Sequence, residues 1–141
     1  MGRSETFEHT ADLGLRIFAT DLPDLFRTAG EALFDVIVAN RSDVRVVETE
    51  LVSLTAESIE DLLVQWLNEL IFRCETRHRL YTQFDATLDE NGRRLEATIG
   101  GEPIDRGRHV LDHEVKAATR HELSLQQQVG GEWIAEVIVD I

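Results

Sequence analysis

The spacing of the apolar residues switches between two periods along this chain, and that switch limits the fold more than any other feature. Residues 13–20 alternate, with Leu13, Leu15 and Ile17 on one side, as expected for a strand with one buried face. Residues 22–37 instead place apolar side chains three or four positions apart, which is typical of an amphipathic helix. The chain therefore combines helices with a sheet.

The first predicted helix has recognisable ends. Asp21 is a natural N-cap, because its carboxylate can accept hydrogen bonds from the free amides of the first turn. Pro23 is tolerated there, since that position needs no intrahelical donor. We expect the helix to end near Ala39–Asn40, because asparagine tolerates the left-handed conformation that terminates many helices.

A second helix is predicted by the apolar stripe that runs from Ile59 to Cys74. Ser58 precedes it as the N-cap, and Asp61 lies three residues further on, where its carboxylate can return a hydrogen bond. Cys74 falls on the buried stripe. We therefore interpret it as a small core residue and not as a nucleophile.

The other alternating segments predict strands, and Asn91-Gly92 between two of them predicts a hairpin. The expected strands are 6–8, 13–20, 44–54, 83–88, 94–99, 114–125 and 133–141, with a connection over 100–113 and a last turn near Gly130-Gly131. We predict an α+β fold in a single domain spanning residues 1–141. It has a mainly antiparallel sheet and two helices, in the order ββαβα followed by two β-hairpins.

Composition and charge exclude several classes of protein. The 141 residues include 27 acidic and 14 basic side chains, a net charge of −13, which disfavours a general nucleic-acid binder. Such a chain attracts cations or basic partner surfaces. No apolar run approaches the roughly 20 residues that span a bilayer, and no signal core is present, so we expect a cytoplasmic protein without a membrane partner. A single cysteine excludes a disulfide framework and a multi-cysteine zinc site.

The last predicted strand carries acids at its end. Residues 133–141 are mostly apolar on both faces, which is typical of a central strand. Asp140 and the terminal carboxylate of Ile141 are therefore adjacent anions, and burying them unpaired would be costly. A two-residue Gly130-Gly131 turn would place His121 opposite Asp140, with Lys116 nearby.

Asp12, which precedes an early strand, could join these acids if that strand neighbours the last one. Asp12, Asp140 and the carboxylate of Ile141 would then offer only oxygen ligands, which suit Ca²⁺, Mg²⁺ or Mn²⁺. A salt bridge or a solvated strand end explains the same residues without a metal.

Other constellations give weaker hypotheses. His109 and His113 are four residues apart, which is ligand spacing on a helix, but their segment is not helical in pattern. No nucleophile elbow, Walker loop or dinucleotide fingerprint occurs. A metal-assisted hydrolase with His121 or His9 as general base, and a chaperone-like assembly module for RNA-processing proteins, remain alternatives.

Four motifs in order resemble the archease family. They are His9-Thr10-Ala11-Asp12-Leu13-Gly14-Leu15-Arg16, Gly101-Glu102 with Asp105 and His109, Val115-Lys116-Ala117-Ala118-Thr119-Arg120-His121, and Val139-Asp140-Ile141. Together they cover essentially the whole chain. Arg120 departs from the family, in which an aromatic residue is common at that position.

The resemblance implies a function that periodicity does not reveal. Archeases are small α+β proteins that act with the RtcB type of tRNA-splicing RNA ligase, promote its guanylylation and allow multiple turnover. They are not ligases themselves, and no sequence-specific nucleic-acid binding of their own is expected. The family binds a divalent metal, most often assigned as calcium. Its ligands map onto Asp12, Asp140 and Ile141, while Lys116, His121 and His9 lie near the same site.

Overall fold

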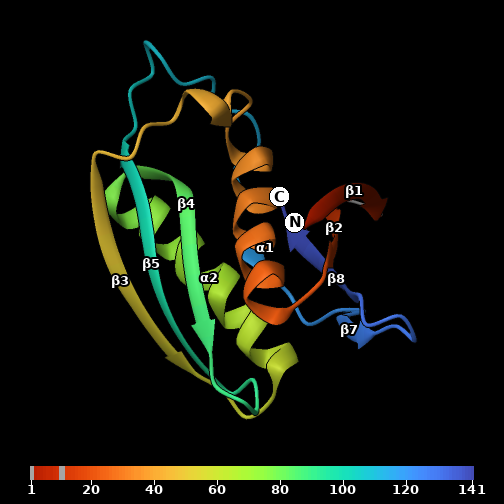
Figure 1. The fold of residues 1–141 in the computed structure, drawn as a ribbon. Coiled ribbons are helices and arrows are strands. Elements are labelled where there is room, and N and C mark those ends of the chain that lie inside the picture. The colour runs from red at the N-terminus through yellow and green to blue at the C-terminus, as the bar shows by residue number, and fades with distance from the viewer. Residues whose placement is uncertain (1, 10–11) are drawn as a thin grey trace.

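Two helices and eight strands make up the computed structural model, which describes residues 2–9 and 12–141 (Figure 1). In chain order they are β1 (Arg3–His9), β2 (Asp12–Ala19), α1 (Leu22–Ile37), β3 (Glu48–Thr55), α2 (Ile59–Arg77), β4 (Arg79–Leu88), β5 (Arg94–Pro103), β6 (Ala117–Ala118), β7 (Ser124–Gln127) and β8 (Trp133–Asp140), with a 3-10 turn at Arg41–Asp43. The predicted α+β class and element order are confirmed.

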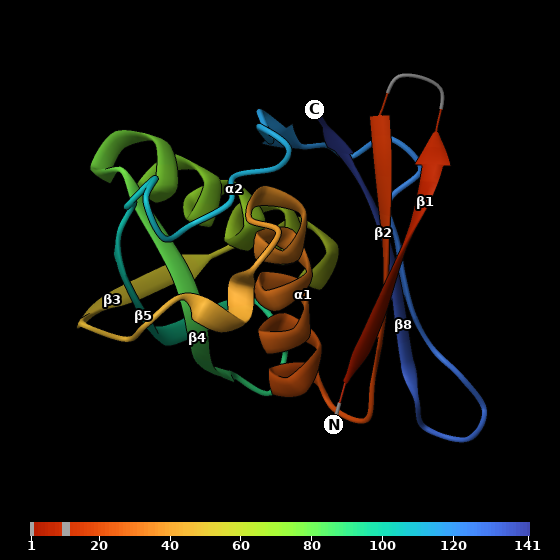
Figure 2. The same cartoon turned by 90° about the horizontal axis from the view of Figure 1, so that it is seen from above.

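The strands form two sheets where the sequence suggested one. One sheet has the order β1-β2-β8-β6, with β7 also paired to β8, and the other has the order β3-β5-β4. Every pairing between described strands is antiparallel. Helices α1 and α2 lie between the sheets and contact both of them (Figures 1 and 2). No helix within residues 2–9 and 12–141 is both long enough and apolar enough to cross a bilayer.

Helix α1 begins as predicted and ends earlier than predicted. The Asp21 carboxylate accepts a hydrogen bond of 2.8 Å from the Asp24 amide. The helix stops at Ile37, and Val38 is extended, so the expected left-handed end near Ala39–Asn40 is wrong. The cause is a long-range contact, because Val38 forms a β-bridge with Leu111.

Asn40 has a different role from the one expected. Its side-chain amide accepts from the Val110 amide at 2.8 Å and donates to the Arg108 carbonyl at 2.9 Å. The residue therefore fixes the connection that follows β5 against the end of α1.

Helix α2 follows the predicted stripe from its cap to its last turns. Ser58 accepts from the Asp61 amide at 3.1 Å, while the Asp61 carboxylate accepts from Arg120 Nε at 2.8 Å. The helix continues to Arg77 and ends at His78, which takes the left-handed conformation (φ 53°).

Cys74 is partly buried against the core, and this burial raises the pKa of its thiol to about 11. The thiol is therefore not activated as a nucleophile.

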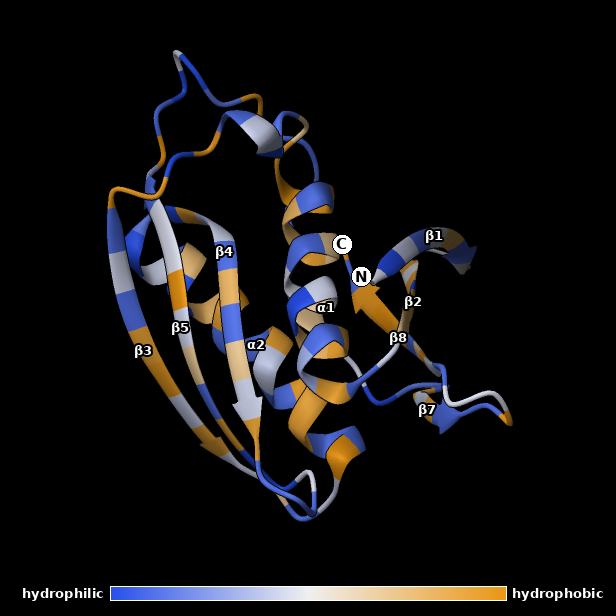
Figure 3. Ribbon diagram, in the orientation of Figure 1, coloured by the Kyte–Doolittle hydropathy of each residue, from blue (hydrophilic) through white to orange (hydrophobic). Residues whose placement is uncertain are grey.

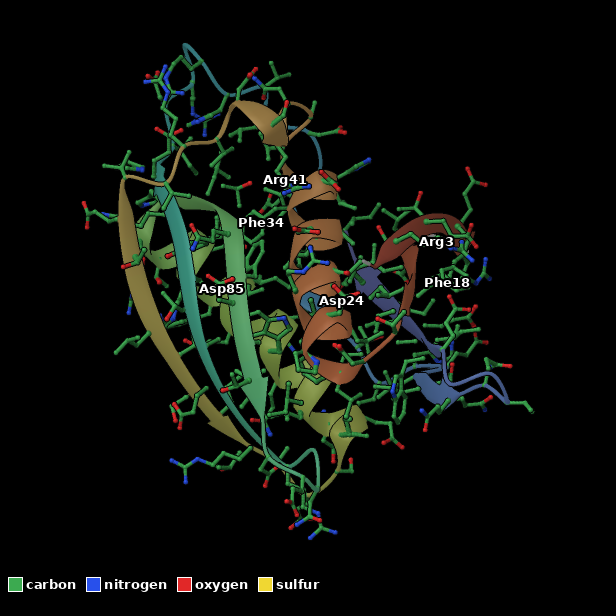
Figure 4. All side chains as sticks on the ribbon, in the orientation of Figure 1. Arg3, Phe18, Asp24, Phe34, Arg41 and Asp85 are labelled. Atoms are coloured by element: carbon green, nitrogen blue, oxygen red, sulfur yellow. The ribbon has the colours of Figure 1, made fainter. Side chains whose placement is uncertain are left out.

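Aromatic side chains from both helices and from β4 form the centre of the core. Trp66 of α2 is fully buried and donates from its indole nitrogen to the Phe26 carbonyl at 2.9 Å. Phe34 lies between α1 and β4, with its ring 5.7 Å from that of Tyr81 and 5.9 Å from that of Phe84 (Figure 4). These contacts join α1 and α2 to the β3-β5-β4 sheet.

Strand positions agree in outline with the alternating segments. Gly92 takes a positive φ of 67° in the turn between β4 and β5, as the Asn91-Gly92 pair predicts. Residues 44–47 are not a strand, since the chain leaves the 3-10 turn and enters β3 only at Glu48. Strand β8 is central, between β2 and the β6 and β7 strands, and is largely hydrophobic along its length (Figure 3).

A buried acid secures the connection after β5. Glu102 is only 4% exposed and accepts from the Arg45 amide at 2.8 Å, from the Arg108 guanidinium, and from His109 Nε2 at 2.9 Å. His109 accepts from the Asp105 amide through Nδ1, which assigns the ring proton to Nε2. Burial alone would raise the pKa of Glu102, but these hydrogen bonds outweigh it and lower the pKa to about 2.

We expect Glu102→Gln to destabilise the fold by about 3 kcal/mol near neutral pH, because it leaves Arg108 without its buried partner. The folded pKa of about 2 lies below the ordinary value of 4.5, so this stabilisation is present above pH 4.5 and is lost as the pH falls towards 2. Urea unfolding of both proteins across this range measures the difference. The exposed Glu90→Gln is the matched control, and a constant difference at every pH would contradict the assignment.

Candidate metal centre

The candidate centre lies where β2 begins and β8 ends. The last paired residues of these strands are Leu13 and Val139, so the next position along each strand sets Asp12 across from Asp140. Directly opposed residues of antiparallel strands have Cα atoms about 4.5–5.5 Å apart and side chains on the same face. Figure 2 shows the C-terminus at the end of the sheet where β2 begins. Two acids from opposite ends of the sequence are therefore neighbours.

The alternation of β2 assigns these acids to the outer face of the sheet. Leu15 and Ile17 are fully buried towards α1, so the even-numbered residues of β2 face away from the helices. On β8 the buried Val137 and Val139 likewise place Asp140 on the outer side. Asp140 is exposed and Asp12 is half-buried.

The outer face next to the acids is close-packed. The Phe7 ring covers Gly14 so tightly that a Cβ atom at residue 14 would lie 2.2 Å from the ring. Arg16 in turn lies over the Phe7 ring, 4.7 Å from its centroid. Further along this face, Arg3 covers the ring of Phe18 at 3.6 Å (Figure 4). Only glycine at position 14 leaves room for this arrangement.

Arg16 is not free to neutralise the aspartates. Its guanidinium is held between Glu136, at 2.5 Å, and Glu5, at 2.6 Å. Among residues 2–9 and 12–141, no hydrogen bond or ion pair joins the carboxylate of Asp12 or of Asp140 to another side chain. The sequence analysis gave a salt bridge to these aspartates as an alternative to a metal, and no such salt bridge is found in the described part of the chain.

The residues around Asp140 and Ile141 lie along this edge of the sheet. The Lys116 amide donates to the Asp140 carbonyl at 2.8 Å, and Ala117 is the residue paired with Asp140. The Ile141 side chain is half-buried against the core, which holds the end of the chain in place. The Lys116 side chain is exposed beside it.

Asn68 of α2 supports this edge and was not singled out from the sequence. Its side-chain amide accepts from the Ala118 amide at 2.8 Å and donates to the Ala118 carbonyl at 3.1 Å. These two bonds replace a neighbouring strand on the open side of β6. The signal in the sequence is weak, namely an uncharged polar residue at the border of an apolar helix stripe.

His121 does not lie opposite Asp140, so that prediction is wrong. Thr119 donates to the Ile138 carbonyl, whereas Ser124 pairs with Glu136. The chain therefore advances five residues between these two contacts, while the facing strand β8 advances only two. The three extra residues form a turn in which Glu122 has a positive φ of 53°. His121 is exposed in this turn, with Nε2 3.8 Å from Glu122 Oε1.

The remaining predicted residues are placed only in part. The backbone of His9 pairs with Asp12, but Thr10, Ala11 and the side chain of His9 lie outside the described part of the structure. His109 is buried against Glu102, and the 104–116 segment contains no helix, so His109 and His113 do not form a helical ligand pair. Within the described ranges, no three side chains of His, Cys, Asp or Glu form a group that could hold a metal. The predicted set has two such side chains, because its third ligand is the terminal carboxylate.

Comparison with known proteins adds independent information. A model of the Archease protein family (MTH1598/TM1083) matches residues 5–141. Archeases from Pyrococcus abyssi and Methanopyrus kandleri are 35% and 37% identical to the chain, over 100% and 97% of its length and 100% and 98% of their own.

Two solved structures have the same fold. The solution structure of Methanobacterium thermoautotrophicum protein 1598 has a TM-score of 0.79 and 32% identity, over 98% of both chains. A Thermotoga maritima crystal structure, described as an archease and possible chaperone, has a TM-score of 0.67 over 97% of this chain and 96% of that one. Its 19% identity shows likeness of fold only. The family match and the identities above establish that this chain belongs to the archease family.

Proposed function

We propose that the protein is a non-catalytic activator of an RNA ligase of the RtcB type, and that it acts through a divalent cation held by Asp12, Asp140 and the carboxylate of Ile141. The observation that carries this proposal is the register of β2 and β8, which sets the two aspartates side by side. Membership of the archease family supports the choice of partner. The proposed role is in cytoplasmic tRNA splicing or RNA repair, through ligase guanylylation and repeated turnover.

The donor set fits a hard cation. Two aspartates and a main-chain carboxylate offer only oxygen atoms, and calcium accepts six to eight oxygen ligands at about 2.3–2.6 Å. Magnesium and manganese accept the same donors in smaller shells. When bound, the cation would offset the repulsion between the carboxylates and supply positive charge for a phosphate group. The exposed Lys116 is a second positive group at the same edge.

The charge of the chain suits a partner that handles RNA. A ligase must present basic residues where RNA binds, and a protein with a net charge of −13 is attracted to such a surface. Arg16 holds Glu5 and Glu136 in ion pairs, so these two acids are already neutralised within the chain. Asp12 and Asp140 are left to face the cation and the partner.

The calcium site can be tested without the ligase. We expect Asp12→Asn and Asp140→Asn each to weaken Ca²⁺ binding at least about tenfold, because each removes one charged oxygen ligand. Isothermal titration with CaCl₂, and then with MnCl₂ and MgCl₂, measures the affinity and ranks the metals. Asp85→Asn, an exposed acid on the other sheet (Figure 4), should bind as the unaltered protein does. Equal affinity in all four proteins would exclude the site.

Ligase activation is tested by counting turnovers. We expect Asp12→Asn and Asp140→Asn to lower the stimulation of multiple-turnover ligation by at least about tenfold, while Asp85→Asn retains it. Full stimulation by both site variants would eliminate the carboxylate mechanism.

The same assay separates the alternatives. Product formed by this protein alone from RNA and nucleotide would identify an enzyme. A gain in the amount of soluble, assembled ligase without a change in turnovers per molecule would identify a chaperone-like role, in keeping with the description of the Thermotoga maritima protein.

A further inference from the structure

A cavity of about 540 Å³ has Val115, two residues before β6, in its lining. It is an open cavity lined by the C-terminal ends of α1 and α2 and by the connection between β5 and β6. Its floor is apolar, with Ile37, Ile71 and Val115 only 8%, 4% and 3% exposed. This volume is within the range of cavities that bind small molecules or inserted side chains.

The walls of this cavity are fixed by backbone hydrogen bonds. The Ile104 amide donates to the His78 carbonyl at 2.9 Å, which ties the connection to the end of α2. The Asp112 amide donates to the Ile37 carbonyl at 2.8 Å, which ties it to the end of α1. A cavity held open by such contacts is preformed, so filling it requires little rearrangement.

Acidic side chains dominate the rim. Glu75, Asp112 and Glu114 are exposed around the opening, against one cationic side chain, Arg106. His78 and His113 complete the polar lining. Burial, and then the negative charge of the neighbouring Glu75, raise the pKa of the Cys74 thiol in the cavity lining to about 11.

An apolar floor beneath an acidic rim fits one chemical type of occupant. Arginine and lysine side chains have a hydrocarbon stem that packs on apolar surface and a cationic head that pairs with carboxylates. The net charge of −13 disfavours a second copy of this chain and favours a basic partner. Val115 lines the cavity and Lys116 is bonded to Asp140, so an occupant would lie next to the candidate metal centre.

We infer that this cavity docks a basic segment of the partner protein, with an arginine or lysine side chain inserted over Ile37 and Ile71 and paired with Glu75 and Glu114. The identification of that partner as an RNA ligase rests on the proposed function. The cavity itself can be tested without the ligase.

The probe is a short amidated peptide of alternating arginine and leucine, added to the full chain. We expect it to bind, and to slow the reaction of Cys74 with a maleimide at about pH 8.5, because the cysteine is the only one in the chain and lines the cavity. Glu75→Lys combined with Glu114→Lys should weaken peptide binding at least about tenfold. Glu57→Lys combined with Glu90→Lys makes the same change in net charge on exposed acids near the β4–β5 turn, and should bind nearly as the unaltered protein does.

Three results would overturn the inference: no protection of Cys74, equal weakening by both pairs of substitutions, or equal binding of a glutamate–leucine peptide. Binding to the ligase is measured in a separate experiment, by titrating the ligase with the same variants. Loss of ligase binding in the Glu75 and Glu114 variant alone supports the docking site. Peptide binding in the cavity without any ligase binding by the unaltered chain would retain the basic-segment site and reject the proposed partner.

Discussion

The antiparallel pairing of β2 with β8 is the contact on which the rest of this structure depends. It joins residues 13–19 to residues 133–139 without a shift in register, so the two ends of the sequence share one layer. Leu15 and Val137 are paired on the buried side with no exposure, and a slip of one residue would move the whole apolar set to solvent. Burying one such side chain is worth about 1.5–3 kcal/mol, so packing against α1 selects this register. The same register sets Asp12 across from Asp140.

Local spacing predicts most of the elements, because the information needed lies within a few residues. The caps at Asp21 and Ser58 follow from the sequence for this reason. The errors come from contacts between distant segments. Helix α1 ends early because Val38 pairs with Leu111, and no property of residues 22–40 signals that partner. At the candidate centre, the two aspartates were found from a strand pattern and a family resemblance. His121 was misplaced because its position was counted from a turn, and an extra loop before β7 breaks that count.

The short strand β6 connects the two places where we locate function. On one side its pairing with β8 holds Ala117 beside Asp140, and on the other side Asn68 bonds both backbone groups of Ala118. Val115, one residue before Lys116, forms part of the floor of the cavity between the helix ends. A segment held at each residue in this way cannot move far without breaking backbone hydrogen bonds. A partner seated in the cavity would therefore meet the aspartates at a fixed distance and orientation.

The pattern of ion pairs shows which acids are available to a partner. Glu50 forms ion pairs with Arg73 and Arg77, and the buried Glu102 forms one with Arg108, so both acids already pair with arginines of the same chain. Recruiting such an acid to an outside cation would leave an arginine unpaired, at a cost that grows with burial. Asp12, Asp140, Glu75 and Glu114 form no ion pair with any residue in the described ranges 2–9 and 12–141. They can bind an external cation without that penalty. The arginines thus neutralise some of the acidic residues of the composition and leave others, these four among them, without an ion-pair partner in the described residues.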